Sequence, residues 1–180
     1  MNNYDKNNVH GQGSFGTVYK GVLSVNTVIV LSWINHRNVV KLLGCCLETG
    51  VPLLVYKSIT NGNLYSHIYD RKQGYSSSVL SCQTCLKVAI KISGALLHLH
   101  SETYIPINAI IHRDVKTANI LLDEDYTAKI SNFGTSRLIW IDESHLTTLA
   151  RGTFGYLDPE YSLSSQLTEK SDVYSFRVSC

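Results

Sequence analysis

The sequence predicts an α+β fold with two lobes, in which a strand-rich first third precedes a more helical remainder. The first third is rich in Val and Gly, and its apolar residues fall in short β-branched runs. From Leu86 onward, apolar residues recur at the spacings of a helix face. The chain has 180 residues, 44% of them hydrophobic, with a formal net charge of +2. This is about one domain, and the small charge gives no basic field that would favour nucleic acid as a partner.

Several segments of the first third are expected to be strands. Gly11–Val22 contains glycines followed by the alternating T-V-Y-K-G-V, and Val25–Leu31 is rich in β-branched residues. The run K-L-L-G-C-C-L at 41–47 is typical of a buried strand, and Val51–Ile59 is a further strand candidate. The Asn61-Gly62 pair predicts a turn that closes this region.

The later elements follow from a change of period. A helix is expected through about His100, with one apolar face made by Leu86, Ala89, Ile90, Leu96 and Leu97. Short strands are expected around 110–111, 120–122 and 128–130, and the segment after residue 134 reads as a polar stretch rich in Ser and Thr. The tail from Thr168 predicts a helix whose apolar points are Val173, Phe176 and Val178.

No segment has the features of an export signal or a membrane span. The first ten residues are mostly polar and contain no hydrophobic core of a signal peptide. The longest hydrophobic segment, V-I-V-L-S-W-I at 28–34, is far shorter than the ~20 residues of a membrane-spanning helix. Five cysteines in a chain without a signal peptide favour reduced thiols. We therefore expect no membrane span in this chain and a cytoplasmic setting.

A glycine-rich motif, G-x-G-x-x-G-x-V, occupies residues 11–18. Such glycines let backbone N–H groups approach phosphate oxygens. A dinucleotide-binding loop would open a helix and be followed by an acidic residue about 20 positions on, but here a strand-like alternation follows and the first acidic residue is Glu48. A strand–loop–strand flap over a mononucleotide fits better, and an ordinary glycine-rich hairpin is the alternative.

The more specific motif is H-R-D-x-K-x-x-N at 112–119. Phosphoryl transfer needs a carboxylate that orients the incoming hydroxyl and accepts its proton, a cation near the moving charge, and an oxygen ligand for Mg²⁺. Asp114, Lys116 and Asn119 are the catalytic candidates for these three roles, and Asn119 is also a metal-ligand candidate.

At this point the chain resembles the protein kinase family, and most of all the cytoplasmic kinase domain of plant wall-associated receptor-like kinases. The resemblance is carried by INHRNVVKLLGCCLETGVPLLVY at 34–56, HRDVKTANILLD at 112–123, GTFGYLDPEY at 152–161 and TEKSDVYSF at 168–176. It implies a bilobal fold with ATP and Mg²⁺ in the cleft and protein Ser or Thr as acceptor. Residues 1–180 would form a single partial kinase domain, with a reduced N-lobe and hinge at 1–59 and an incomplete, truncated C-lobe at 60–180.

The resemblance also implies roles for individual residues. Tyr56 would be the gatekeeper beside the adenine, and Asn132 would stand where the family has the metal-binding Asp of D-F-G. Arg113 would receive a phosphate on the activation segment, and Asp172 would brace the catalytic loop. The residues expected to contact the nucleotide are Gly11, Gly13, Gly16, Val18, Tyr56, Lys57 and Ile59. The phosphate acceptors expected for Arg113 are Ser144, Thr147 and Thr148.

The sequence departs from the family where the phosphates are gripped. Active kinases pair a Lys on the third strand with a Glu on the next helix, but this chain has no lysine between Lys20 and Lys41 and no acidic residue between Lys20 and Glu48. The third strand and most of that helix look deleted, and Lys20 is expected to be too far along its strand to substitute. Asn132 lacks the charge that Mg²⁺ favours.

Two further departures concern the large lobe. Arg177 stands where the family usually has Gly. In the family several helices follow the position of residue 180, and without them an apolar face is expected to be exposed.

Three interpretations stay open from the sequence. The chain is a Ser/Thr protein kinase, a non-catalytic kinase-fold module that binds partners or nucleotide, or a poorly folded truncated product. The missing phosphate-gripping residues favour a kinase-family domain with impaired catalysis. Its expected partner is a protein substrate or signalling protein. If the chain is part of a longer receptor, its expected place is the cytoplasmic face of the plasma membrane.

Overall fold

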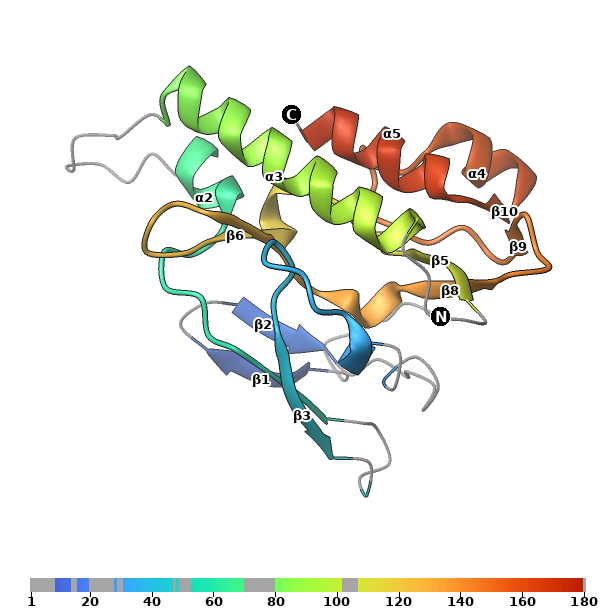
Figure 1. Ribbon diagram of the computed structural model, residues 1–180, viewed down its shortest axis with the longest axis horizontal. Helices are drawn as coiled ribbons and strands as arrows, with labels where there is room; N and C mark the ends of the chain where they lie inside the picture. Colours follow the sequence, from blue (N-terminus) through green and yellow to red (C-terminus); the bar gives the residue numbers. More distant parts are fainter. Residues whose placement is uncertain are drawn as a thin grey trace.

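The computed structural model describes residues 9–13, 16–19, 28, 31–46, 48, 53–69, 80–101 and 107–179. Strands from the first third lie in the lower half of Figure 1, and the longer helices lie together in the upper half. The α+β class predicted from the sequence is confirmed.

The described strands form five antiparallel pairs. The hairpin of β1 (Val9–Gly13) and β2 (Gly16–Tyr19) is one two-stranded sheet, and β3 (Leu42–Cys46) with β4 (Leu53–Tyr56) is another. The remaining pairs are β5 (Ile107–Ile111) with β8 (Arg137–Trp140), β6 (Ile120–Leu122) with β7 (Ala128–Ile130), and β9 (Leu146–Thr147) with β10 (Gln166–Leu167). The strands expected around 110–111, 120–122 and 128–130 are therefore confirmed, whereas β8, β9 and β10 lie in segments where no strand was expected.

Four α-helices have bounds within the described residues: α2 (Leu64–Tyr69), α3 (Cys82–Ser101), α4 (Pro159–Ser164) and α5 (Glu169–Ser179). Two 3-10 helices, η2 (Thr117–Asn119) and η3 (Phe133–Thr135), are also described. Helix α3 begins where the Ser81 hydroxyl accepts a hydrogen bond from the Thr84 N–H at 3.1 Å. Helix α4 begins in the same way, with the Asp158 carboxylate accepting from the Glu160 N–H at 3.0 Å. The helices expected through His100 and from Thr168 are confirmed.

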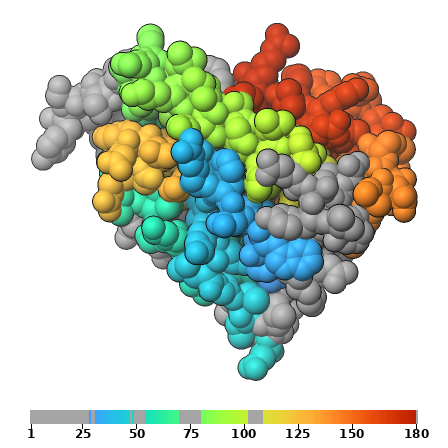
Figure 2. Space-filling view, in the orientation of Figure 1, coloured from blue at the N-terminus to red at the C-terminus, as the bar shows by residue number. Residues whose placement is uncertain are grey.

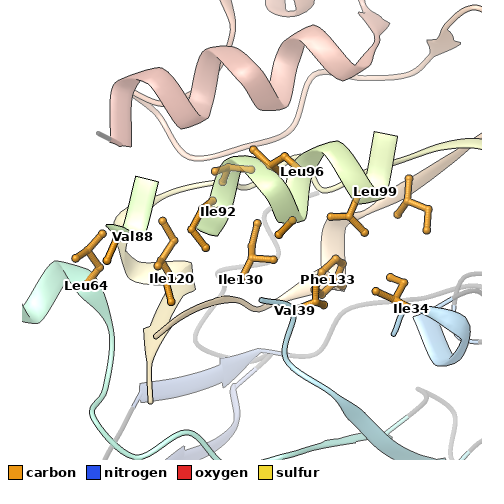
Figure 3. Close-up of a cluster of buried hydrophobic side chains, with 14 of the residues drawn as sticks. Ile34, Val39, Leu64, Val88, Ile92, Leu96, Leu99, Ile120, Ile130 and Phe133 are labelled. Atoms are coloured by element: carbon orange, nitrogen blue, oxygen red, sulfur yellow. The ribbon is translucent and has the colours of Figure 1, made fainter. Parts of the chain in front are cut away.

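The main core lies between α3 and the β6–β7 pair. In Figure 3 Ile92 and Leu99 lie on the side of α3 that faces Ile120, Ile130 and Phe133. Val39 lies below the helix, beside Phe133. Ile92 and the β6–β7 isoleucines are fully buried. A smaller cluster packs the β5–β8 pair against the segment around α4; its buried members are Ala109, Ile111, Ile139, Tyr161 and Leu167.

Asn38 ties the early part of the chain to the β6–β7 pair. Its buried side-chain amide donates to the Ala128 carbonyl at 2.8 Å, and its own carbonyl accepts from the Ile130 N–H at 2.8 Å. Next along the chain, the Val40 N–H donates to the Ile130 carbonyl at 2.9 Å. The predicted turn at Asn61-Gly62 is confirmed, with Gly62 at φ +69°, and its backbone bonds Leu122 of β6.

The strand expected over Val25–Leu31 is wrong at Val28 and Leu31, the two residues of that span that the structure describes. Val28 and Leu31–Trp33 are helical, and Val28, Leu31 and Ile34 are buried at intervals of three residues. Burying one face of a helical turn against the core outweighs the β preference of branched side chains, because propensity is a weak prior beside tertiary packing.

The apolar face assigned to the long helix is also mostly wrong. The residues of α3 that face the core are Val88, Ile92, Ala95, Leu96 and Leu99. Leu86, Ile90 and Leu97 are instead 62%, 58% and 65% exposed. Helix α3 is apolar on two sides, so periodicity alone could not tell which side packs. Val173 and Val178 of α5 are exposed as well, and Figure 2 shows α3 (green) and α5 (red) at the surface of the molecule. That this apolar surface is the one covered by the family's later helices stays a prediction.

The strand expected at 41–47 exists as β3, but it is not buried. Leu43 is 60% exposed and Cys45 is exposed as well. Among the described residues β3 pairs only with β4, and a two-stranded sheet leaves one face open to solvent.

Candidate functional site

The loop after β5 carries the H-R-D motif, and its backbone is hydrogen-bonded to the Asp172 side chain of α5. The buried Asp172 carboxylate accepts from the backbone N–H of His112 at 2.7 Å and of Arg113 at 2.8 Å. Arg113 has φ +70°, a conformation that costs a non-glycine residue about 1–2 kcal/mol. The two hydrogen bonds to a charged acceptor stabilise this strained turn, so Asp172 has the bracing position that the resemblance implies.

Three polar side chains converge on Asp114. Its Oδ2 lies 2.9 Å from Lys116 Nζ and accepts from Asn119 Nδ2 at 2.9 Å. Its Oδ1 accepts from the Thr153 hydroxyl at 2.6 Å, and that hydroxyl accepts from Lys116 Nζ at 2.7 Å. The structure therefore brings together all three predicted catalytic candidates. A carboxylate held in this way can orient an incoming hydroxyl and take up its proton.

Thr153 is a member of this cluster that sequence reasoning missed. It comes from the G-T-F-G segment, 39 residues after Asp114. A Cβ on the preceding Gly152 would lie 3.2 Å from the Arg113 carbonyl and 3.0 Å from Leu157 Cδ1, so glycine permits this close approach. The signal available in the sequence was the Gly-Thr pair that opens the GTFGYLDPEY segment at 152–161.

His112 is a second residue of the site whose structural role was not predicted from the sequence. Burial lowers the pKa of His112 from its ordinary value, although the Asp172 carboxylate acts in the opposite direction. The neutral ring donates from Nε2 to the Ser131 carbonyl at 2.8 Å and accepts at Nδ1 from the Asp114 N–H at 3.3 Å. His112 also packs edge-on against Phe133, with ring centroids 4.8 Å apart. It thus couples the catalytic loop to the S-N-F-G segment.

The two predicted metal candidates lie beside each other. Asn132 has φ +68°, which Asn tolerates better than most residues. Its Nδ2 donates to Asn119 Oδ1 at 3.3 Å. Mg²⁺ prefers carboxylate, phosphate and water oxygens, but both candidates are neutral amides, and the nearby Asp114 carboxylate already contacts Lys116. In the part of the chain that the structure describes, this set of donors does not fit a divalent cation.

Arg113, the predicted phosphate receiver, is buried and bonded to the chain itself. Its guanidinium donates to the Leu149 carbonyl at 2.9 Å and to the Tyr161 hydroxyl. Burial lowers the pKa of neighbouring Arg137, and repulsion from Arg113 and Arg151 lowers it further. These arginines form a cluster of like charge next to the segment that contains the expected acceptors.

The expected acceptors differ in exposure. Ser144 and Thr147 are exposed, while Thr148 is half-buried and its N–H donates to the Ser165 carbonyl at 2.9 Å. Thr148 directly precedes Leu149, the residue whose carbonyl contacts Arg113. The choice among the three stays a prediction.

The predicted nucleotide residues come from two hairpins. In the β1–β2 hairpin, Gly11 pairs with Val18 and Gly13 with Gly16, which confirms a strand–loop–strand arrangement rather than a strand–loop–helix. The side chains of this hairpin, and Lys20, lie outside the described residues.

Tyr56, Lys57 and Ile59 lie at the end of β4 and just after it. Burial raises the pKa of Tyr56 to about 12, and its buried hydroxyl has no hydrogen-bond partner among the described residues. The Lys57 N–H donates to the Lys41 carbonyl at 2.9 Å. Their contact with a nucleotide stays a prediction.

Comparison with known proteins decides the family. The family model for the protein tyrosine and serine/threonine kinase domain matches residues 25–180. The chain belongs to the protein kinase family. It is 52% identical to wall-associated receptor kinase-like 6 and to wall-associated receptor kinase 3, both from Arabidopsis thaliana, with 98% of the chain covered in each comparison. The predicted recognition is confirmed.

The same comparisons bear on the extent of the chain. It spans 30% of the length of the first of these relatives and 26% of the second. The first comparison runs over 197 positions, more than the 180 residues of this chain, so the relative contains residues within the matched region that this chain lacks. No helix in the described part of the chain is long and apolar enough to cross a membrane.

Proposed function

We propose that this chain is a kinase-family domain that keeps the proton-handling part of the phosphoryl-transfer site and has lost efficient transfer. The family's reaction moves the γ-phosphoryl group of ATP to a protein hydroxyl, and its cofactors are ATP and Mg²⁺. The single observation that carries the proposal is the assembled cluster of Asp114, Lys116, Asn119 and Thr153 beside an Asn132 that bonds Asn119.

The size of the loss follows from what the sequence lacks. Removing one preorganised electrostatic group costs about 10²–10³ in rate. Losing both the phosphate-gripping Lys and the metal-binding Asp would cost about 10⁴–10⁶, although such losses do not simply add. Against family turnover of about 1–100 s⁻¹, such a loss leaves transfer close to background. An ordered base does not restore it, because the base acts only on a phosphate that is already held in line.

The role that remains is binding. Twenty-three hydrophobic side chains are buried in the described part of the chain, which supports a folded module over a poorly folded product. We propose a protein partner in signalling and, if the chain belongs to a longer receptor, a place on the cytoplasmic side of the membrane. The similarity to proteins named as receptor kinases supports this placement.

A transfer assay with γ-³²P-ATP, Mg²⁺ or Mn²⁺ and a generic protein acceptor tests the catalytic part. The wild type, Asp114→Ala and the exposed control Asp125→Ala are expected to give equal background. Transfer at family rates that disappears only in Asp114→Ala overturns the proposal. A cooperative melt that ATP raises supports the binding module, whereas the lack of any cooperative melt supports the poorly folded alternative.

A further inference from the structure

The hydrogen bonds around Asn119 fix which way its amide points. Its Nδ2 donates both to the Asp114 backbone carbonyl at 2.7 Å and to Asp114 Oδ2 at 2.9 Å. A flipped amide would set a carbonyl oxygen against a carbonyl and a carboxylate, so that arrangement is excluded on electrostatic grounds. Asn119 Oδ1 must therefore face away from Asp114, and it faces Asn132.

The partner of that oxygen then has to be a donor or a cation. Asn132 supplies the donor through Nδ2 at 3.3 Å. An aspartate at position 132 would set a carboxylate oxygen against the Asn119 oxygen, and only a cation or a proton between them would relieve the repulsion. The backbone does not choose between the two residues, because both Asn and Asp tolerate the left-handed conformation found here.

The N–H groups of Lys116 and Asn132 that are not used in the contacts above favour binding of an anion. Lys116 Nζ carries three N–H groups and contacts Asp114 and the Thr153 hydroxyl, which leaves one N–H beyond these two contacts. Asn132 Nδ2 likewise has an N–H beyond the one given to Asn119.

We propose that the Asn119–Asn132 amide pair replaces the divalent cation in this domain. The fold then needs no Mg²⁺ at this point, and any polyphosphate that binds meets N–H donors directly rather than through a metal. The inference rests on the proposed function for the identity of the site, but its test requires neither nucleotide nor activity.

The test is the melting temperature of the chain in EDTA and in excess Mn²⁺ or Mg²⁺. The wild type is expected to melt at the same temperature in both. Asn132→Asp is expected to melt lower in EDTA and to rise by about 3–6 °C at roughly ten times the cation's dissociation constant. Asn132→Ala removes the donor without adding a charge and should show no cation response. Ser162→Asp adds an exposed carboxylate on α4 and should show none either.

A titration of free Mn²⁺ by electron paramagnetic resonance counts bound ions without relying on a melting transition. The proposal expects no site in the wild type and one site in Asn132→Asp. A wild-type site that Asn132→Ala removes overturns the proposal, and so does Asn132→Asp that gains neither a bound ion nor a cation response. A separate ADP titration that shows no nucleotide binding counts against a nucleotide-binding role in the proposed function. It does not change the interpretation of the cation measurements.

Discussion

Replacing Asp172 by alanine tests how the catalytic loop is held. The change leaves the buried N–H groups of His112 and Arg113 without their acceptor, and it also removes the 3.0 Å contact between Asp172 and His100 Nε2. Each buried donor left unsatisfied costs about 1–3 kcal/mol. The total expected loss is about 3–5 kcal/mol, in the range measured for breaking a buried charged partner. This is a large fraction of a typical stability of about 5–15 kcal/mol.

Urea unfolding followed by circular dichroism measures this loss. Asp172→Asn keeps one acceptor oxygen and is expected to fall between the wild type and the alanine variant. The exposed Asp125→Ala is the matched control and is expected to change stability by less than about 0.5 kcal/mol. If Asp172→Ala costs less than about 1 kcal/mol, the two backbone hydrogen bonds do not hold the loop as argued.

Further predictions concern burial, pH and the exposed face. Tyr56→Phe removes a buried hydroxyl that has no described partner, so it is expected to leave thermal stability unchanged or to raise it by about 1 kcal/mol, and a clear loss would reveal a partner. Because the folded-state pKa of Tyr56 is about 12, the wild type should lose stability as pH rises above the ordinary value near 10, and Tyr56→Phe should lose less. The folded-state pKa of His112 lies below its ordinary value of 6.5, so below that pH the unfolded chain binds a proton that the folded chain does not. The free energy of unfolding should therefore fall as pH drops below about 6.5. In denaturation experiments from pH 5 to 7, His112→Phe should make the free energy of unfolding depend less on pH. Leu97→Lys is expected to leave the unfolding free energy within about 0.5 kcal/mol and to reduce self-association in light scattering, because Leu97 is 65% exposed.

Much of the fold could be predicted from local pattern. The glycine hairpin, the turn at Gly62 and the helix from Thr168 depend on residue types whose preferences act over a few positions. The errors fall where tertiary contacts decide. The β-branched run at 25–31 predicted a strand, but Val28, Leu31 and Ile34 share one buried side at intervals of three residues. Both sides of α3 are apolar, so which side packs depended on neighbours that the pattern does not reveal.

The site residues also fall into those that a local motif identifies and those that only the folded structure brings together. Asp114, Lys116 and Asn119 fall within six residues, so a single motif identified all three. Thr153 reaches Asp114 only through the folded path of the chain, and His112 gains its role from burial against Phe133. That Asn132 lacks a charge could be read directly from the sequence. The hydrogen bond between Asn132 and Asn119 required the coordinates, because it depends on which way Asn119 is turned.

The central claim is that this chain has a catalytic-loop lysine but no lysine that grips the phosphates. Labelling with an acyl-phosphate derivative of ATP tests it most directly, because the probe acylates lysines that lie beside the bound phosphates and mass spectrometry then identifies them. The account predicts that any label blocked by excess ATP falls on Lys116 and that none falls on Lys20. ATP-protected labelling of Lys20 would reveal a substitute clamp and contradict the account.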